Sequence, residues 1–474
     1  MFKIYPAHPV NHEIMSSKTQ QIWLPDLICI DGHFVSDRAL VCDDGKVVQI
    51  IEGNQAANAI RLKNRALLPG LVNAHSHAFQ RVIRGRTERR SQNTTDTFWT
   101  WREQMYTAAN RLEPEDIYAV SRMAFLEMAL TGITAVGEFH YIHHARDGST
   151  YSDPNLLSRE VIRAARDVGI RIALLRVAYA RAGFEKEPDP KQIRFIENSP
   201  ETYLKHLEQL LTAPELKDGM AWAGVAPHSV RAVPLDYLKR IGGFANERAL
   251  PVHMHVAEQA AEVSACIEEY GRSPVALLDT EGLLSNRFTA VHAIHVTPKA
   301  IAAMARAGAL VCACPTTERN LGDGVVPVDA YFNAGVPVAL GTDSQIQIDL
   351  LEDARELEYH LRLQQTGRNV LAPQDNASSS ALARLLFHCA SVAGAKSIGF
   401  HGGGKLEPGA PADFFTVDLD DPSIAGASQD DLLATIVFSL SRTAVRDVVV
   451  AGKQIVENGR HRDQEAIIES FVHR

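Results

Sequence analysis

Short apolar runs that alternate with longer amphipathic stretches are the feature that most constrains how this chain folds. The runs are nearly continuous in hydrophobicity and several are rich in Val and Ile, as expected of parallel strands that are buried on both faces. Eight such runs occur, at residues 70–75, 133–139, 170–179, 221–227, 250–256, 288–294, 309–315 and 336–343. Eight strands, each followed by a helix, predict an α/β fold with a (β/α)8 TIM-like barrel. A doubly wound open sheet is the structural alternative.

Helical patterns fill the intervals between these runs. Residues 114–130 and 298–308 both have Pro in the first turn, and Gly308 follows the end of the second pattern. Proline at the start of a helix and glycine after its end are typical positions for these residues. We expect further helices at residues 377–399 to close the barrel.

The two flanks of the barrel have a different pattern, in which short alternating segments are separated by turns. Residues 22–67 contain Asp-Gly pairs at 31–32 and 44–45, which are typical of tight turns between strands, and residues 405–460 alternate in the same way. We expect both chain ends to join in one small β-sandwich domain beside the barrel. The predicted limits are a loose N-terminal arm at 1–20, the β-sandwich at 21–67 and 403–474, and a metal-dependent barrel at 68–402.

Composition excludes several classes of protein. The formal net charge is −9, which argues against a general nucleic-acid binder because phosphate neutralisation needs a basic surface. No run of apolar residues is long enough to span a membrane, and the first residues lack the apolar centre of a secretory signal. The six cysteines form no CxxC pair, so we interpret them as reduced thiols. We therefore expect a soluble cytoplasmic protein with no nucleic-acid or membrane partner.

Two histidines stand at the end of the first predicted barrel strand. His75 and His77 are two residues apart, and side chains at i and i+2 of a strand point to the same face. Two imidazoles that converge at the mouth of a barrel suit a metal such as Zn²⁺. An isolated HxH motif is weak evidence, because this chain has 19 histidines.

Three further strand ends carry residues of the same chemical type. The fifth run ends in His253 and His255, with Glu258 three residues beyond, where the strand gives way to a loop. His292 ends the sixth run and Asp343 ends the eighth. Glu258 as a helix cap and Asp343 in an ordinary turn are the alternatives for single residues. In a barrel, however, all these strand ends lie on one rim, where active sites are built, so together they predict a metal site.

These residues and their order resemble the amidohydrolase superfamily, and more narrowly its mononuclear deaminase branch. No Lys ends the fourth predicted strand, where binuclear members place a carbamylated Lys, so the resemblance implies a single metal ion. A narrower resemblance links the chain to the family of N-formimino-L-glutamate iminohydrolases, in matching order from about residue 25 to 460. It is carried by HSHAFQR (75–81), FWTWRE (98–103), EFHYIHH (138–144), HSVRAV (228–233), HMHVAEQ (253–259), CPTTERNLGDG (314–324) and GTDS (341–344).

The sequence departs from this family in two places. The N-terminal arm is longer than expected, and Gln345 follows the GTDS motif where some members have His. The second departure puts a contact at the rim in doubt and leaves the predicted metal site unaffected.

The resemblance implies a zinc enzyme that hydrolyses a small dianionic amidine, N-formimino-L-glutamate, to N-formyl-L-glutamate and ammonia in histidine degradation. It implies one Zn²⁺ per subunit, or another divalent transition metal, and we expect a homodimer. The expected metal ligands are His75, His77, His255 and Asp343. The expected catalytic residues are Glu258, His292 and Asp343. The expected contacts to the substrate carboxylates are Gln80, Arg102, Tyr141, His228 and Arg231.

The charge of this substrate explains the residue types. Planar guanidinium groups match a carboxylate in two parallel hydrogen bonds, and Arg102 and Arg231 are expected on loops after strands 1 and 4. A surface salt bridge is their structural alternative. We expect His292 and Asp343 to accept a proton from a metal-activated water, and ionised Glu258 to bind the amidinium and carry a proton to the departing nitrogen.

Several alternatives remain open from the sequence. The same metal site could deaminate a purine, pterin or adenosine-like ring, and a barrel without catalysis could serve as a scaffold or store metal. Tyr141 and His228 could be core groups. Trp99 and Trp101 could stack on substrate or form a structural cluster, whereas Cys312 and Cys314 are interpreted as small core residues.

Overall fold

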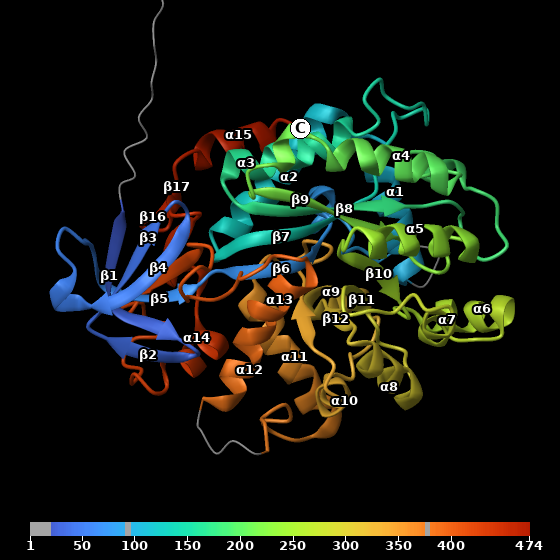
Figure 1. The fold of residues 1–474 in the computed structure, drawn as a ribbon. Helices are drawn as coiled ribbons and strands as arrows, with labels where there is room; N and C mark the ends of the chain where they lie inside the picture. The colour runs from blue at the N-terminus through green and yellow to red at the C-terminus, as the bar shows by residue number, and fades with distance from the viewer. Residues whose placement is uncertain (1–19, 91–95, 375–379) are drawn as a thin grey trace, which may run out of the picture.

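The computed structural model describes residues 20–90, 96–374 and 380–474. The predicted arm at 1–20 lies outside these residues except for its last position. Two bodies of regular structure are visible, a barrel surrounded by helices and a β-sheet at its side (Figure 1). In the described part of the chain, no helix is both long enough and apolar enough to cross a membrane.

Eight parallel strands form the barrel, and neighbouring strands in the sheet follow the order of the sequence from β6 to β13. This order excludes the doubly wound open sheet, in which the strand order reverses. Each predicted run overlaps one of the strands, and only β6 and β7 extend beyond their runs, by one residue each. They are β6 (Leu71–Ser76), β7 (Ile133–His140), β8 (Arg171–Ala178), β9 (Ala221–Pro227), β10 (Val252–Val256), β11 (Phe288–His292), β12 (Leu310–Ala313) and β13 (Val338–Leu340).

The first and last strands meet just beyond β13. Ser76 forms a parallel bridge with Asp343. The Asp343 N–H donates to the His75 carbonyl at 3.0 Å, and the His77 N–H donates to the Asp343 carbonyl at 3.0 Å. The barrel therefore closes at the residues that the sequence singled out as metal ligands.

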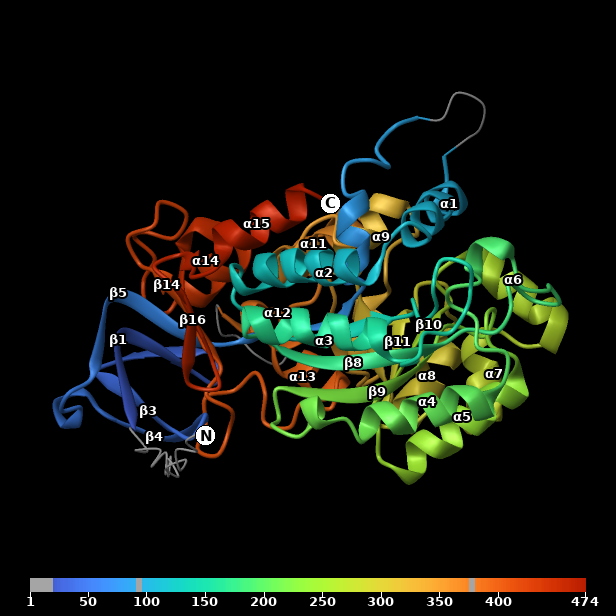
Figure 2. The same ribbon diagram turned by 90° about the horizontal axis from the view of Figure 1, so that it is seen from above.

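Helices cover the outside of the barrel in the connections between strands (Figures 1 and 2). The helices from the first strand to the last are α1 (Phe98–Ala109), α2 (Pro114–Ala129), α3 (Leu156–Val168), α4 (Pro200–Leu211), α5 (Leu235–Glu247), α6 (Ala260–Tyr270), α7 (Pro274–Thr280), α8 (Pro298–Ala307), α9 (Pro315–Leu321) and α10 (Val328–Asn333). Those after the last strand are α11 (Leu350–Gln365), α12 (Ala381–Cys389), α13 (Val392–Ser397), α14 (Leu432–Ser439) and α15 (Gln464–Val472). Short 3-10 turns are η1 (Gly53–Gln55), η2 (Ala78–Ile83), η3 (Pro190–Gln192), η4 (Pro214–Leu216) and η5 (Arg442–Ala444). The helix α15 lies along α2.

Helix α13 packs against small side chains of the barrel strands. A Cβ atom added at Gly394 would lie 2.3 Å from the Val72 carbonyl oxygen, so only glycine allows this close approach of helix and strand. The indole of Trp222 on β9 donates to the Ile398 carbonyl at 2.7 Å, just after the helix. The buried cluster includes Val72, Ala74, Ala135, Ala173, Ala339, Ala393, Ala395 and Ile398. The described part of the predicted helical segment at 377–399 thus packs on the barrel, as expected.

Strands from both chain ends form a single mixed sheet of nine strands. Its order is β17-β16-β15-β14-β5-β1-β3-β4, and β2 pairs with β1. The members are β1 (Gln21–Ile30), β2 (His33–Ser36), β3 (Arg38–Asp43), β4 (Lys46–Glu52), β5 (Ile60–Pro69), β14 (Phe414–Asp418), β15 (Val445–Val450), β16 (Lys453–Glu457) and β17 (Arg460–His461). The joining of the two ends is confirmed through the antiparallel pair β5 and β14. The exact domain limits stay a prediction.

A buried ion pair connects this sheet to the barrel. Arg171, the first residue of β8, donates from Nε and Nη2 to the two carboxylate oxygens of Asp413 at 2.7 and 3.0 Å. Asp413 also accepts the Ala451 N–H at 2.7 Å, and its carbonyl accepts the Gly70 N–H at 3.0 Å. The side chains of Arg171 and Asp413 are only 8% and 3% exposed, so the pair is poorly screened by water.

We predict that Arg171→Met lowers the free energy of unfolding by about 3 kcal/mol, because it leaves the Asp413 carboxylate buried without its charge partner. A urea titration followed by circular dichroism measures this change. The matched control is Arg240→Met on α5, which removes an ion pair whose side chains are 63% and 67% exposed and should cost less than about 0.5 kcal/mol. Equal stability of the two variants would contradict a connecting role for Arg171.

Candidate metal centre and active site

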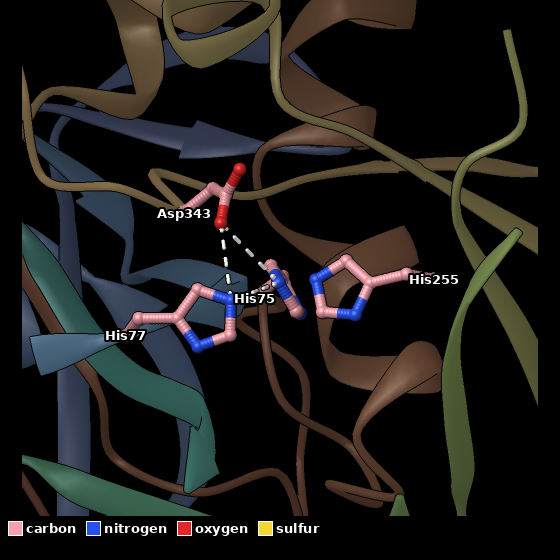
Figure 3. Close-up of side chains that lie close together, drawn as sticks. All are labelled: His75, His77, His255 and Asp343. Carbon is pink, nitrogen blue, oxygen red and sulfur yellow. Dashed lines mark hydrogen bonds and ion pairs between the residues drawn. The ribbon is translucent and has the colours of Figure 1, made fainter. Parts of the chain in front are cut away.

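Four predicted ligands converge at the carboxyl ends of the barrel strands. One donor atom each from His75, His77, His255 and Asp343 lies within 4.8 Å of the others, and all four residues are buried (Figure 3). The Nε2 atoms of His75 and His77 are 3.2 Å apart. Asp343 Oδ1 lies 3.3 Å from Nε2 of His77 and 3.5 Å from Nε2 of His75. The structure therefore brings together the complete predicted ligand set.

Hydrogen bonds behind the imidazoles fix which nitrogen faces the centre. Nδ1 of His77 donates to the Phe139 carbonyl at 2.9 Å, and Nδ1 of His255 donates to the His228 carbonyl at 3.2 Å. With Nδ1 protonated in this way, the Nε2 lone pair of each ring is free to bind a metal ion. Nδ1 of His75 has no hydrogen-bond partner in the described part of the chain.

The protonation states suit a divalent cation. Burial lowers the pKa of His75 to about 3 and also lowers the pKa of His77 and His255, so the imidazoles are neutral at pH 7. Burial opposes ionisation of Asp343, but its hydrogen bond with His75 and the neighbouring imidazoles hold its pKa below the usual range. Nε2 of His75 and Nε2 of His77 lie 3.2 Å apart, and Asp343 Oδ1 lies near both, so all three atoms can face one bound cation. Three imidazole nitrogens and one carboxylate are a donor set that zinc prefers.

Gln345 lies behind this group and is fully buried. Its Nε2 donates to Ser76 Oγ at 2.8 Å and to the Asp343 carbonyl at 3.1 Å, and its Oε1 accepts from Thr342 Oγ1 at 3.0 Å. Gln345, where the sequence departs from the family, therefore makes buried side-chain contacts in place of a contact at the rim. Gln345 ties β6 to the segment after β13, where Asp343 has a positive φ of 45°. Such strained backbone persists where the surrounding contacts enforce it.

The predicted acid–base residues flank the metal-binding group. His292 Nε2 lies 3.6 Å from Glu258 Oε1 and 3.7 Å from Asp343 Oδ2. Nδ1 of His292 donates to Glu318 Oε1 at 3.1 Å, and the same oxygen accepts the Cys314 N–H at 2.9 Å. Burial raises the pKa of Glu258, although His292 lowers it in part. The geometry places two carboxylates, those of Glu258 and Asp343, beside the same nitrogen of His292, which is therefore positioned to exchange a proton with either.

All five predicted substrate-binding residues line one pocket above the metal-binding group, together with Glu258 and His292. These five are Gln80, Arg102, Tyr141, His228 and Arg231. Further lining residues are Phe98, Trp101, Met105, Tyr106, Tyr179 and Leu321. The pocket therefore joins the predicted carboxylate contacts to the predicted metal centre.

Arg102 lies on helix α1, and the expectation that it lies on a loop is wrong. The helix starts after Thr97, whose N–H donates to Thr100 Oγ1 at 2.9 Å, while Thr100 Oγ1 donates to the Thr97 carbonyl at 2.8 Å. These hydrogen bonds satisfy groups that the first helical turn leaves free. The aromatic residues of FWTW did not indicate a helix start in the sequence. From this helix, the side chain of Arg102 points toward the pocket.

The guanidinium groups of Arg102 and Arg231 have unused donors. Nε and Nη1 of Arg102 and Nη1 of Arg231 are buried without a hydrogen-bond partner, and neither residue forms an ion pair with any residue that the structure describes. The salt-bridge interpretation thus lacks a partner here. The centre of the Trp99 ring lies 4.5 Å from Cζ of Arg102, so Trp99 packs against this side chain, whereas Trp101 lines the pocket.

The sequence interpretation missed several buried residues around the site. Glu138, at the end of β7, accepts from Ser76 Oγ at 2.5 Å and from the Ala78 N–H at 2.8 Å. Glu318 orients His292 from the start of α9. Glu138 lies near a strand end, so the rule that found Asp343 could also have found it, whereas Glu318 lies within α9 and no strand-end rule indicates it.

Comparisons with known proteins agree with the fold. A family model described as the amidohydrolase family matches residues 66–455. Formimidoylglutamate deiminase of Pseudomonas aeruginosa is 40% identical over 443 residues, covering 93% of this chain and 96% of the relative. A 5-methylthioadenosine/S-adenosylhomocysteine deaminase of Natronomonas pharaonis is 27% identical over 460 residues, covering 94% and 93%.

Two solved structures show the same fold. An amidohydrolase from Brucella melitensis has a TM-score of 0.88 and 34% identity, covering 96% of this chain and 98% of the other. An adenosine deaminase from Xanthomonas campestris, solved with bound zinc, has a TM-score of 0.77 and 23% identity, covering 96% and 97%. The second likeness concerns the fold alone.

We predict that His255→Asn removes the metal, whereas His253→Asn retains about one equivalent per chain. Both histidines lie on β10, but His253 Nε2 donates to the Ser397 carbonyl at 2.9 Å, away from the ligand cluster. Elemental analysis of the purified variants measures metal per chain. Loss of metal from both variants, with folding intact by circular dichroism, would contradict this separation of roles.

Proposed function

The chain belongs to the amidohydrolase family, and we propose that it is a zinc-dependent deiminase that hydrolyses N-formimino-L-glutamate to N-formyl-L-glutamate and ammonia, a step of histidine degradation. One observation carries the proposal: the pocket combines two guanidinium groups with unused donors and a metal-binding group beside Glu258. A substrate with two carboxylates and one amidinium needs this combination of charges. The 40% identity to formimidoylglutamate deiminase supports the same substrate.

His75, His77, His255 and Asp343 would hold one zinc ion. When bound, the ion supplies a Lewis acid that makes water a stronger nucleophile at neutral pH. Another divalent transition metal with the same preference for imidazole and carboxylate would also fit this donor set.

His292 and Asp343 act as proton acceptors when water attacks the amidine carbon. Nε2 of His292 faces both Asp343 and Glu258, and Glu318 holds the opposite nitrogen of the ring. A proton taken from the attacking water can therefore pass from this pair to Glu258 without a large movement.

Glu258 binds the cationic amidine and delivers the proton to the leaving nitrogen. A C–O bond forms as water adds, and the carbon–nitrogen bond to the terminal NH₂ group breaks once Glu258 has protonated that nitrogen, which leaves as ammonia. As the C=O bond of the product forms, the hydroxyl proton passes to Asp343. Glu258 must be ionised to bind the cationic substrate. It carries the proton only after the C–O bond has formed and before the C–N bond breaks. The buried position of Glu258 strengthens its attraction for the amidinium.

Arg102 and Arg231 bind the substrate carboxylates, with Gln80, Tyr141 and His228 as neutral partners. Gln80 Nε2 donates to the Tyr141 hydroxyl at 3.0 Å, which leaves the phenol proton for another acceptor. Tyr141 Oη lies 3.3 Å from Met105 Sδ, a weak acceptor that a carboxylate would readily replace.

Deamination of a purine, pterin or adenosine-like ring is the alternative, and it is the kind of reaction named for several relatives of lower identity. The two guanidinium groups disfavour it. An uncharged ring has no carboxylate to neutralise the buried guanidinium groups of Arg102 and Arg231, so the cost of burying these charges would not be offset.

Three further parts of the proposal concern the whole protein. The six free cysteines are all buried, which fits a reducing cytoplasmic location.

We propose a homodimer, which sedimentation velocity tests directly. We also propose the domain limits at 21–67 with 403–474 and at 68–402, which limited proteolysis tests.

We predict that Glu258→Gln abolishes ammonia release from N-formimino-L-glutamate while about one metal ion per chain is retained. The amide is isosteric, but it cannot carry a proton or attract the amidinium as a carboxylate does. An ammonia assay and elemental analysis of the same preparation give the two readouts. If Glu258→Gln loses the metal, then Glu258 is itself a metal ligand, and the assignment of Asp343 as the carboxylate ligand is wrong.

We predict that Arg231→Met lowers kcat/KM for N-formimino-L-glutamate at least about 30-fold, as expected when one partner of a buried charge pair is removed. The control is Arg306→Met on α8, an exposed arginine paired with Asp279, which should retain wild-type kinetics. Full activity of the Arg231 variant would remove this residue from the substrate site. Absence of turnover by the wild type, with clear activity on a purine, would refute the proposed substrate.

A further inference from the structure

Two tyrosines that the mechanism above does not use line the pocket beside the arginines. Tyr106 lies on α1, one helical turn after Arg102, and Tyr179 follows directly after β8. Their side chains are almost fully buried, and their hydroxyl oxygens are 3.5 Å apart. The ring of Phe195 packs against both, with centroid distances of 5.8 and 5.9 Å.

Gln192 holds the two hydroxyl groups from behind. Its Nε2 donates to Tyr106 Oη at 2.6 Å and to Tyr179 Oη at 2.8 Å, which uses both amide hydrogens. Main-chain hydrogen bonds fix Gln192 itself, since its N–H donates to the Asp189 carbonyl and its carbonyl accepts the Phe195 N–H, both at 2.8 Å. Gln192 is buried and does not line the pocket.

The hydrogen-bond inventory then determines what the phenols can do. In this orientation of the amide, whose Oε1 has no partner in the described part of the chain, each phenol oxygen accepts from Gln192 and keeps its own proton to donate. Apart from each other's oxygen, the two hydroxyls have no acceptor among the residues that the structure describes. If one phenol donates to the other, the second proton still needs an acceptor. Burial also raises the pKa of Tyr106 above its ordinary value, which keeps this phenol in its donor form.

The neighbouring arginines, like the two phenols, need a ligand that accepts hydrogen bonds. Cζ of Arg102 lies 5.4 Å from the centre of the Tyr106 ring, and the Arg231 guanidinium lies next to the Tyr179 hydroxyl. Both arginines have buried donors without partners in the described structure. This end of the pocket thus presents guanidinium and phenol donors together, and a carboxylate is the ligand that accepts from both.

We propose that Tyr106 and Tyr179 donate hydrogen bonds to the substrate carboxylate that Arg102 and Arg231 neutralise, and that Gln192 is the positioning residue that keeps both phenols as donors. This inference rests on the proposed function and deepens it. It adds selectivity for a carboxylate over a carboxamide, because the NH₂ group of an amide would meet only donors here.

The experiment compares metal-loaded wild type with Tyr106→Phe, Tyr179→Phe and Gln192→Glu. Glutarate is the dicarboxylate probe and glutaramate, its monoamide, is the second probe. Isothermal titration calorimetry measures their dissociation constants without any turnover. Steady-state kinetics with N-formimino-L-glutamate then separates KM from kcat.

We expect each Phe variant to weaken glutarate binding about tenfold, the factor of one hydrogen bond to a charged group, and to raise KM with kcat changed less than threefold. Gln192→Glu should weaken it about 100-fold or more, because a carboxylate in place of the amide draws both phenol protons away from the pocket. Wild type should prefer glutarate over glutaramate, and the Phe variants should lose part of this preference.

Tyr203→Phe is the control for loss of a buried phenol. Its hydroxyl donates to the Arg176 carbonyl at 2.7 Å, outside the pocket, so glutarate affinity should stay within twofold of wild type. Unchanged glutarate affinity in both pocket variants, or an equal loss in Tyr203→Phe, would overturn the inference. Failure of wild type to bind glutarate would overturn it too. If wild type binds glutarate but does not release ammonia from N-formimino-L-glutamate, the proposed function fails while the assignment of the phenols is still decided by the binding data.

Discussion

Closure of the barrel between β6 and the segment after β13 is the constraint on which the rest of the site depends. The same two main-chain hydrogen bonds that close the sheet join Asp343 to His75 and His77. Asn73 reinforces the seam, since its side chain donates to Thr342 Oγ1 at 2.7 Å and accepts the Thr342 N–H at 3.1 Å. A metal ligand set assembled in this way exists only when the first and last strands are paired, so folding and metal binding are coupled.

The pocket combines groups of opposite charge. Asp343 and Glu258 attract a cationic amidine, and Arg102 and Arg231 attract carboxylates. The two kinds of group come from different elements: residues at or just after strand ends supply the carboxylates, whereas α1 and the loop after β9 supply the guanidinium groups. Rigid strand ends suit bond making and breaking, which needs fixed geometry, and the outer elements can set the length of the substrate without disturbing the metal ligands.

The sequence was sufficient to predict the eight strands and the residues at their ends, because buried parallel strands leave a strong apolar signal and barrel geometry places their ends on one rim. It also predicted that the two chain ends join. Contacts between residues far apart in the chain were not predictable. Gln345 reaching Ser76, and Gln192 reaching Tyr106, depend on side-chain directions that no local pattern encodes. The helical position of Arg102 was missed because a local cap outweighed the aromatic pattern.

The net charge of −9 sets a last condition on how this protein binds a dianion. At physiological ionic strength, charges on the exposed surface are screened beyond about 8 Å, so the overall negative field has little effect inside the pocket. Buried donors are screened much less. Because Arg102, Arg231 and their phenol neighbours have few protein acceptors, the positive potential there is not cancelled locally. An acidic protein can therefore bind a dianionic substrate through a small number of buried, unpaired donors, and its surface charge is free to serve solubility.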